Sequence, residues 1–224
     1  MYAMILAAGR GERMRPLTDK LPKPLLKVNN KSLIVYHLEK LAALGVKHVV
    51  INQAWLGHKL KQHLGCGQQW GIEITYLDEG ERALETAGGI KNALPHLKSE
   101  CFIVINGDVW SDFDLNLLPK SLADNELAHL VLVNNPRHNL NGDFHYVNGI
   151  LHSEGEEKRT FSGIGVYRHE LFREVPKDVA PLGPLLRHAM GQQQITGQLH
   201  LGLWTDVGTP ERLKQLDQQL ALNN

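Results

Sequence analysis

The first residues able to bind an anion follow directly after the apolar run at positions 3–8. Gly9 and Gly11 stand in a short loop, Arg13 comes soon after them, and Lys23 follows between two prolines. Glycine lets the backbone adopt positive φ and lets N–H groups come close to an anion, while arginine and lysine add full positive charges. Because so many donors are costly to gather without a ligand, we interpret this segment as a phosphate-binding loop that follows a buried strand.

Two common phosphate motifs do not fit this loop. The dinucleotide motif G-x-G-x-x-G needs a third glycine where Met14 stands, and the second expected strand ends in Asn52 instead of an acidic residue. The Walker A motif needs Gly-Lys-Ser/Thr, which the sequence lacks. The loop is therefore either a phosphate loop of another class or a glycine-rich turn with solvated arginines.

Two aspartates are candidate metal ligands. Asp108 comes directly after the apolar run 102–106, and Asp206 precedes a Gly-Thr-Pro turn. Mg²⁺ prefers hard oxygen ligands and usually takes only one or two protein carboxylates, although either aspartate could instead stabilise a turn or cap a helix. The segment Asp112-Phe113-Asp114 has the D-x-D form of nucleotide-sugar glycosyltransferases, but its position suits the exposed start of a helix.

The composition excludes several classes of function. Among 224 residues, 24 Lys and Arg balance 24 Asp and Glu, so neither nucleic acid nor a membrane is expected as a partner. The histidines do not have zinc-ligand spacing, and Ser162 lacks the preceding glycine of a nucleophile elbow. The opening apolar run is too short for a signal peptide or a membrane span. Cys66 and Cys101 give no disulfide framework, which favours a cytoplasmic protein.

The elements that must position these residues alternate between strand and helix. Apolar runs predict strands at residues 3–8, 48–52, 72–77 and 102–106. Periodic apolar positions predict helices after Ser32 as far as Leu44, over residues 55–64, and over residues 85–94. This order is typical of a doubly wound α/β fold with a mostly parallel, mixed central sheet, whose ligands bind at the carboxyl ends of the strands.

The second half of the chain is less regular. Strands are expected at residues 129–133 and 161–167, with a close backbone approach at the glycines of the latter, and a hairpin is expected around Asn148-Gly149. We expect one domain over residues 1–224, with a nucleotide-binding half (about 1–126), a sugar-phosphate half (about 127–208) and a C-terminal helix (209–222) that Thr209 caps.

Four segments together resemble the sugar-1-phosphate nucleotidyltransferases, which make nucleoside-diphosphate sugars. They cover nearly the whole chain and occur in the family's order and at similar spacing: residues 6–18 with Pro22-Lys23-Pro24, residues 85–89, residues 106–108 and residues 204–209. The resemblance implies a Rossmann-like, GT-A-like nucleotidyltransferase fold and a Mg²⁺-dependent enzyme acting on a nucleoside triphosphate and a sugar 1-phosphate. The chain lacks the hexapeptide repeats of a fused acetyltransferase module.

The resemblance also implies roles for individual residues. Asp108 and Asp206 would hold Mg²⁺, Lys23 would contact the α-phosphate, and Arg13 would bind the pyrophosphate; the expected catalytic residues are thus Lys23, Arg13 and Asp108. The nucleotide would be bound by Leu6, Ala8, Gly9, Gly11, Glu12, Arg13, Lys23, Asn52, Ala54 and Gly88. The sugar would be bound by Asn106, Asp143, Arg137 and Lys158, with Arg137 or Arg159 as the cation for an acidic sugar.

Within that family, the resemblance is strongest for transfer of a uridylyl group from UTP to N-acetylmuramate 1-phosphate in cell-wall recycling. Related enzymes often read a pyrimidine with a glutamine, and residues 79–84, where it would stand, contain none. Uracil would then be read mainly by backbone groups, which leaves guanine open. Two alternatives remain: a mannose-1-phosphate guanylyltransferase, and a non-catalytic regulatory subunit of the same fold. The sequence does not determine the oligomeric state.

Overall fold

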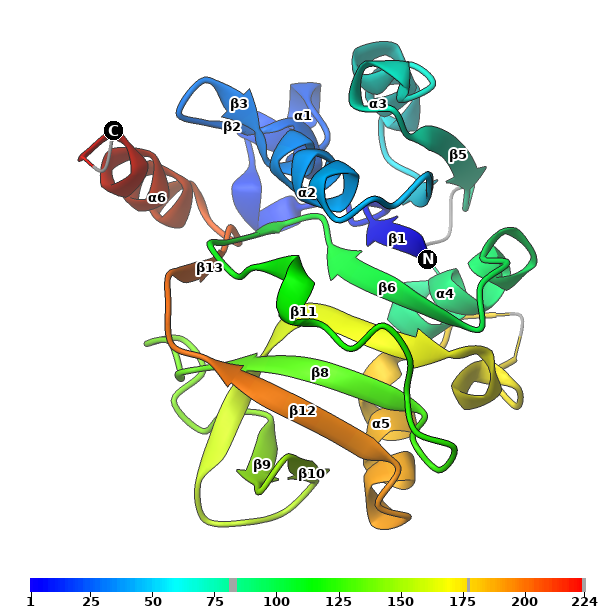
Figure 1. Ribbon diagram of the computed structural model, residues 1–224. Helices are drawn as coiled ribbons and strands as arrows, with labels where there is room; N and C mark the ends of the chain where they lie inside the picture. The colour runs from blue at the N-terminus through cyan, green and yellow to red at the C-terminus, as the bar shows by residue number, and fades with distance from the viewer. Residues whose placement is uncertain (81–83, 177, 223–224) are drawn as a thin grey trace.

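The computed structural model describes residues 1–80, 84–176 and 178–222. Its centre is a nine-stranded sheet in the order β5-β4-β1-β6-β11-β8-β12-β10-β9 (Figure 1). The strands of this sheet are β1 (Tyr2–Leu6), β4 (His48–Gln53), β5 (Glu73–Asp78), β6 (Cys101–Asn106), β8 (Ala128–Val133), β9 (Phe144–Val147), β10 (Ile150–His152), β11 (Lys158–Arg168) and β12 (Ile195–His200).

The sheet changes direction at β11. Strands β5, β4, β1 and β6 are parallel, whereas β11 is antiparallel to both β6 and β8. The register places Leu6 opposite Asn52 on one side and opposite Asn106 on the other. The carboxyl ends of three parallel strands therefore meet at one edge of the sheet, which confirms the predicted mixed, doubly wound fold.

Helices cover both faces of the sheet, because successive residues of a strand point to opposite sides. Ala3 and Ile5 pack in a core with α2 (Leu33–Ala43) and α3 (Gly57–Leu64). Met4 packs on the opposite face, in a core with α4 (Glu85–Ala93) and α5 (Leu182–Gly191). The sheet is thus buried between two helical layers, as its nearly continuous apolar strands require.

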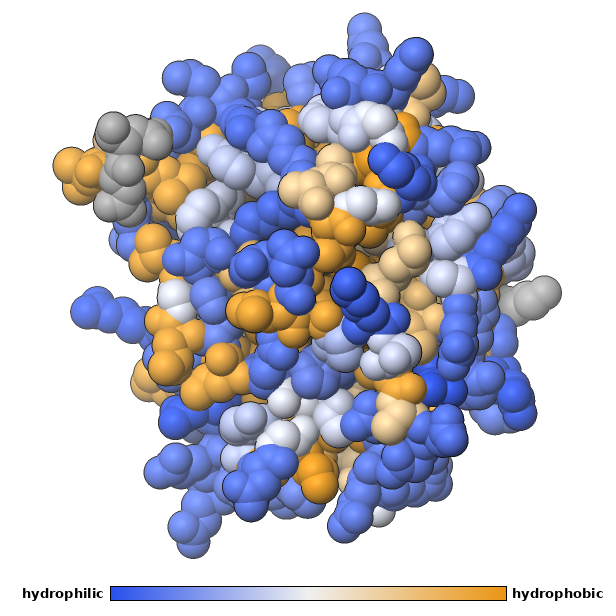
Figure 2. Space-filling model, viewed as in Figure 1, coloured by the Kyte–Doolittle hydropathy of each residue, from blue (hydrophilic) through white to orange (hydrophobic). Residues whose placement is uncertain are grey.

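Smaller elements surround the strand ends. They are α1 (Leu17–Lys20), the hairpin of β2 (Lys27–Val28) and β3 (Lys31–Ser32), the pair of β7 (Val109–Ser111) and β13 (Trp204–Asp206), the C-terminal helix α6 (Pro210–Leu222), and six 3-10 helices: η1 (Glu12–Met14), η2 (Lys23–Leu25), η3 (Gln68–Trp70), η4 (Leu94–His96), η5 (Leu115–Leu117) and η6 (His169–Phe172). No helix in the described ranges is long and apolar enough to cross a membrane. Hydrophilic side chains cover much of the face in Figure 2, with apolar ones between them.

Several predicted elements agree with the structure and others differ. Asn148 and Gly149 have positive φ in the turn between β9 and β10, as the hairpin prediction requires. Helix α3 starts later than predicted because Leu56 adopts a left-handed conformation. Ser32 precedes α2 but does not cap it; its hydroxyl lies 3.3 Å from His63 Nε2. Strand β12 was not predicted, because its glycine and polar residues interrupt any apolar run.

Met14, which replaces the third glycine of the dinucleotide motif, anchors the loop to the last helix. It is fully buried in a cluster with Leu216 and Leu220 of α6. We expect Met14→Ala to lower the free energy of unfolding by about 2–5 kcal/mol, because it leaves a cavity in this cluster. Denaturant unfolding measures this change in free energy. The control is Leu222→Ala, at an 86% exposed position of α6, which should change the free energy of unfolding by under about 0.5 kcal/mol. Equal stability of Met14→Ala and wild type would contradict this packing.

Candidate active site

The carboxyl ends of β1, β4 and β6 open into a cavity of about 520 Å³. Most of the residues predicted to bind the nucleotide line this cavity, and six of its lining residues were not predicted as site residues: Ala7, Pro24, Glu79, Glu85, Thr86 and Gly208. The other lining residues are Leu6, Ala8, Gly9, Gly11, Glu12, Arg13, Lys23, Asn52, Asn106 and Asp108. The strand-end rule therefore located the cavity, and the fold brings together segments from both ends of the chain.

Gly11 determines the shape of the phosphate loop. Its φ of +67° is in the left-handed region, and a Cβ there would come within 3.0 Å of Thr18 Cγ2 and 3.3 Å of Lys23 Cβ. The Gly11 carbonyl accepts hydrogen bonds from the Thr18 hydroxyl at 2.8 Å and from the Met14 amide at 2.9 Å. A larger residue at this position would separate the loop from the lysine-bearing segment.

Lys23 is the most buried cation of the cavity. Lys23 lies on the short helix η2 and is only 8% exposed. Its Nζ donates a hydrogen bond to Asp108 Oδ2. A buried ammonium needs a counter-ion, and Asp108 supplies it from the turn after β6. The contact joins residues 85 positions apart and places a cation beside a carboxylate at the mouth of the phosphate loop.

Two glycines hold Asp108 and Asn106 in place. The Gly107 amide donates to the Leu6 carbonyl at 2.8 Å, and a Cβ on Gly107 would come within 2.7 Å of that oxygen. Gly163 of β11 has φ +80°, and a Cβ there would come within 2.6 Å of Asn106 Nδ2. The predicted close approach at the glycines of this strand is confirmed, and the missing side chain of Gly163 leaves room for the Asn106 side chain.

Asn52 ties the end of β4 to the beginning of the loop. It is 3% exposed; its Oδ1 accepts from the Ala7 amide at 2.8 Å, and its Nδ2 donates to Glu79 at 2.7 Å. The other oxygen of Glu79 accepts from the Leu84 amide at 3.0 Å. Glu79 was not predicted as a site residue, although its position directly after β5, at the end of a parallel strand, would have indicated it.

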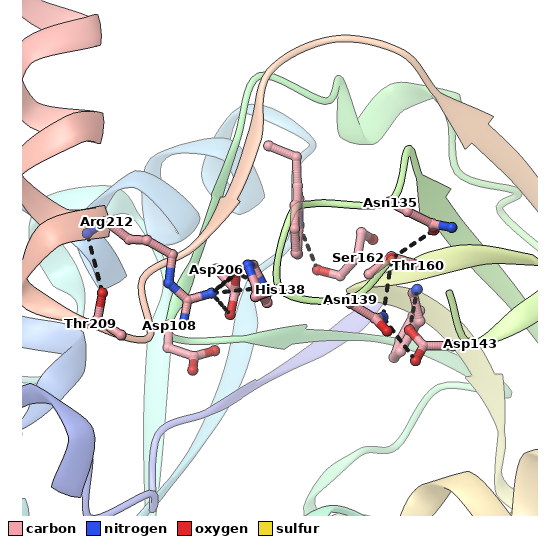
Figure 3. A network of polar contacts seen from close by, with 12 residues as sticks. Asp108, Asn135, His138, Asn139, Asp143, Thr160, Ser162, Asp206, Thr209 and Arg212 are labelled. Carbon is pink, nitrogen blue, oxygen red and sulfur yellow. Dashed lines mark hydrogen bonds and ion pairs between the residues drawn. The ribbon is translucent and has the colours of Figure 1, made fainter. Parts of the chain in front are cut away.

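Asp206 belongs to a second charged cluster beside the cavity (Figure 3). Strand β13 pairs with β7, and the Val207 amide donates to the Asp108 carbonyl at 2.8 Å, so the two predicted metal ligands lie on neighbouring segments. Arg212 Nη1 lies 2.6 and 2.7 Å from the two oxygens of Asp206, and His138 Nε2 lies 2.9 Å from one of them. Neither His138 nor Arg212 was predicted from the sequence to belong to the site.

A smaller cavity of about 230 Å³ lies between Asp108 and Asp206 on one side and β11 on the other. Its walls include Asn106, Asn139, Thr160 and Trp204. Behind it, a network of hydrogen bonds holds the loop before β9. The Thr160 hydroxyl donates to Asn135 at 2.9 Å and accepts from Asn139 at 3.2 Å, and Asp143 accepts from the Phe161 amide at 2.8 Å.

The remaining predicted site residues lie away from these walls. Ala54 follows β4 and does not line the large cavity, and Gly88 is buried in α4 against the backbone of residues 178–180. Asp143 supports the network behind the small cavity. Lys158 and Arg159 face Glu154 and Glu157 in ion pairs. Arg137 lines a third cavity, next to His138.

The D-x-D segment points away from the site. Asp112 Oδ1 lies 2.7 Å from His200 Nε2, and Asp114 caps the short helix η5 by accepting from the Asn116 amide at 2.9 Å.

Burial lowers the pKa of His37 to about 4, so its imidazole is neutral at pH 7. The buried His37 therefore cannot serve as a charged phosphate ligand.

The described residues contain no group of three or more His, Cys, Asp or Glu side chains placed to hold a metal ion by themselves. Asp108 and Asp206 supply two hard carboxylates on neighbouring segments that line one small cavity. This donor set fits Mg²⁺, which usually takes one or two protein carboxylates and completes its shell with substrate phosphates and water. It would not suit a structural zinc site, which closes with four protein ligands.

A glycine-containing loop at the carboxyl edge of a mixed sheet, with cations and carboxylates facing one cavity, is typical of a nucleotide-binding α/β enzyme. The chain belongs to the nucleotidyl transferase family, whose sequence profile matches residues 2–149. The match includes the phosphate loop, Lys23 and Asp108, while Asp206 and Arg212 lie beyond its end.

Several relatives resemble nearly the whole chain. The N-acetylmuramate alpha-1-phosphate uridylyltransferase of Neisseria meningitidis is 50% identical and covers 96% of this chain, which in turn covers 96% of it. The enzyme of that name from Caulobacter vibrioides is 31% identical, with coverage of 98% and 96%. The crystal structure of HddC from Yersinia pseudotuberculosis has a TM-score of 0.80 at 20% identity, covering 98% of this chain and 99% of that one, which confirms the fold.

Proposed function

We propose that this protein transfers the uridylyl group of UTP to N-acetylmuramic acid α-1-phosphate, giving UDP-N-acetylmuramate and pyrophosphate. The proposal rests on the two relatives with this activity in their names and on one geometric observation. The buried Lys23 and the partly exposed Asp108 pair beside the loop at residues 9–13, where a cation and a carboxylate can face the same phosphate. All the charged groups that such a reaction needs are therefore present.

In this reaction, an oxygen of the sugar 1-phosphate attacks the α-phosphorus of UTP. A new P–O bond forms, the bond between the α-phosphorus and the bridging oxygen to the β-phosphorus breaks, and pyrophosphate leaves with that electron pair. The attacking phosphate is already anionic, so no protein nucleophile or general base is required. The protein contributes by positioning the two substrates and by neutralising the charge that develops.

The residues that line the cavity have different roles in this reaction. Lys23 donates to the α-phosphate, whose oxygens gain negative charge in the transition state. Arg13 and the amides of residues 9–13 hold the triphosphate tail. Asn52 and Glu79 fix the backbone of Ala7, beside which the base would lie. The small cavity behind Asp108 is the expected sugar site, where Asn106 is placed to bond a hydroxyl or the acetamide.

Asp108 and Asp206 would hold Mg²⁺. When bound, the ion would polarise phosphoryl oxygens and neutralise the charge of the two substrates. The ion pairs with Lys23 and Arg212 hold the two carboxylates in place. We expect the enzyme to work in the cytoplasm, where its unpaired cysteines would stay reduced and its product would return to peptidoglycan synthesis.

The test is Mg²⁺-dependent release of pyrophosphate for each nucleoside triphosphate combined with N-acetylmuramate 1-phosphate, N-acetylglucosamine 1-phosphate, glucose 1-phosphate or mannose 1-phosphate. We expect a signal with UTP and N-acetylmuramate 1-phosphate at least about tenfold above every other pair. A preference for GTP and mannose 1-phosphate would overturn the proposed substrates and keep the mechanism. The second outcome has a basis in the mannose-1-phosphate guanylyltransferase of Mycobacterium tuberculosis, which is 29% identical over 93% of this chain, although this chain covers only 61% of it.

A further inference from the structure

Arg212 is a cation beside the site to which the reaction described above assigns no contact with a substrate. Its side chain, in the first turn of α6, is 16% exposed, and Nη1 makes its ion pair with Asp206. Within the described residues, Nη1 is the only guanidinium nitrogen of Arg212 with a hydrogen bond. A guanidinium has five N–H donors, so the edge formed by Nε and Nη2 remains for another ligand.

The free edge of Arg212 lies against Gly208 and next to Arg13. A Cβ added to Gly208 would collide with Arg212 Nη2 and would lie 3.3 Å from Arg13 Nη2. Two guanidinium groups therefore approach one point of the backbone, and Arg13 has no ion pair among the residues that the structure describes. Like charges at such a separation repel each other, and an anion between them removes the repulsion.

The cavities that these residues line place the two guanidinium groups beside the loop at residues 9–13. Arg13 and Gly208 both line the cavity at the ends of β1, β4 and β6, and Arg13 also lines the third cavity, of about 570 Å³. Among the described residues of that third cavity, Arg13, Arg137 and Arg212 face a single acid, Asp206. The positive charge is therefore in excess where the triphosphate tail would leave the phosphate loop.

We propose that Arg212 is a second pyrophosphate-binding residue, which together with Arg13 holds the β- and γ-phosphates and the departing pyrophosphate. The proposal rests on the proposed function only for the reaction being nucleotidyl transfer, and not for the identity of base or sugar. Pyrophosphate suits the position because it is a compact anion of high charge, and two guanidinium groups can each donate two parallel hydrogen bonds to it.

Gly208 is part of the same arrangement. Its φ does not lie in the left-handed region, so alanine fits the backbone there, but its Cβ must displace the Arg212 guanidinium. Two substitutions thus test one contact from opposite sides. Arg212→Lys keeps a cation beside Asp206 but lacks the free guanidinium edge, and Gly208→Ala keeps the guanidinium but moves it. Lys214→Gln is the control, because it removes a charge from an exposed position of the same helix.

The experiment is calorimetric titration of each folded protein with magnesium pyrophosphate. We expect Arg212→Lys and Gly208→Ala to bind pyrophosphate about tenfold more weakly than wild type, with less than a twofold change for Lys214→Gln. The double variant with Arg212→Lys and Gly208→Ala should bind pyrophosphate with an affinity no lower than that of the lower-affinity single variant, since both substitutions remove the same contact. Because the probe is pyrophosphate itself, this result does not depend on whether UTP or N-acetylmuramate 1-phosphate is the true substrate.

A parallel titration with UDP-N-acetylmuramate and UDP-N-acetylglucosamine tests whether Arg212 instead binds the carboxylate of the sugar. Unchanged pyrophosphate affinity in both variants would overturn the proposal. A selective loss of UDP-N-acetylmuramate affinity without loss of pyrophosphate affinity would also overturn it and assign Arg212 to the sugar. Failure of wild type to bind magnesium pyrophosphate would overturn it as well, and melting temperatures show that each variant is folded.

Discussion

Lys23→Ala should lower kcat of the forward reaction by about 10² or more, with KM for either substrate changing by less than about threefold. The reason is that Lys23 would contact the α-phosphate, whose charge increases in the transition state, so the contact is stronger there than in the bound substrate. One such donor is commonly worth about 3 kcal/mol. Steady-state kinetics at saturating Mg²⁺, with each substrate varied in turn, separates the two parameters.

The matched control for Lys23→Ala is Lys20→Ala. Lys20 is exposed on α1, only a few residues away, and its side chain has no hydrogen bond or ion pair among the described residues, whereas its backbone carbonyl accepts from Lys59. Its replacement should leave kcat within about a factor of two. A rise in KM at constant kcat in Lys23→Ala would remove Lys23 from the chemistry, because it would mean that substrate and transition state are bound equally.

Replacing Asp108 by asparagine should reduce Mg²⁺-dependent turnover by about 10³ or more at every Mg²⁺ concentration. The change removes one of two carboxylates that would hold the ion and also takes away the counter-ion of the buried Lys23. Binding of Mn²⁺, followed by its electron paramagnetic resonance signal, should weaken by about tenfold or more independently of activity. The fold should survive, since the Asp108 side chain is 36% exposed.

Asp112→Asn provides the comparison for Asp108→Asn. Asp112 is a nearby acid that pairs with His200 and does not line the cavities of the site, so its replacement should change neither Mn²⁺ binding nor turnover by more than about twofold. Activity of Asp108→Asn close to wild type at ordinary Mg²⁺ would show that Asp108 is not a metal ligand. Lost activity with unchanged Mn²⁺ affinity would restrict Asp108 to positioning Lys23.

Much of the fold followed from local patterns. Short apolar runs ending in glycine or asparagine predicted the parallel strands and their common ligand-binding edge, because a buried parallel strand requires apolar residues on both faces. The turn at Asn148-Gly149 and the close approach at Gly163 also came from residue type, since these positions need conformations or space that few residues allow. By contrast, β12 was missed because its pairing with β8, more than its own residues, makes it a strand.

The site divides in the same way. The sequence by itself was enough to predict the loop at residues 9–13, Lys23 and the two aspartates as site residues, because positive φ, full charge and hard oxygens are properties of the residues themselves. Only the tertiary structure decided which of these groups meet: β1 and β6 are neighbours, so Lys23 reaches Asp108, and β13 pairs with β7, so Asp206 joins them. The tertiary structure also decided that Arg212 and His138 contact Asp206. Contacts between distant segments depend on strand order and packing, which no local sequence pattern encodes.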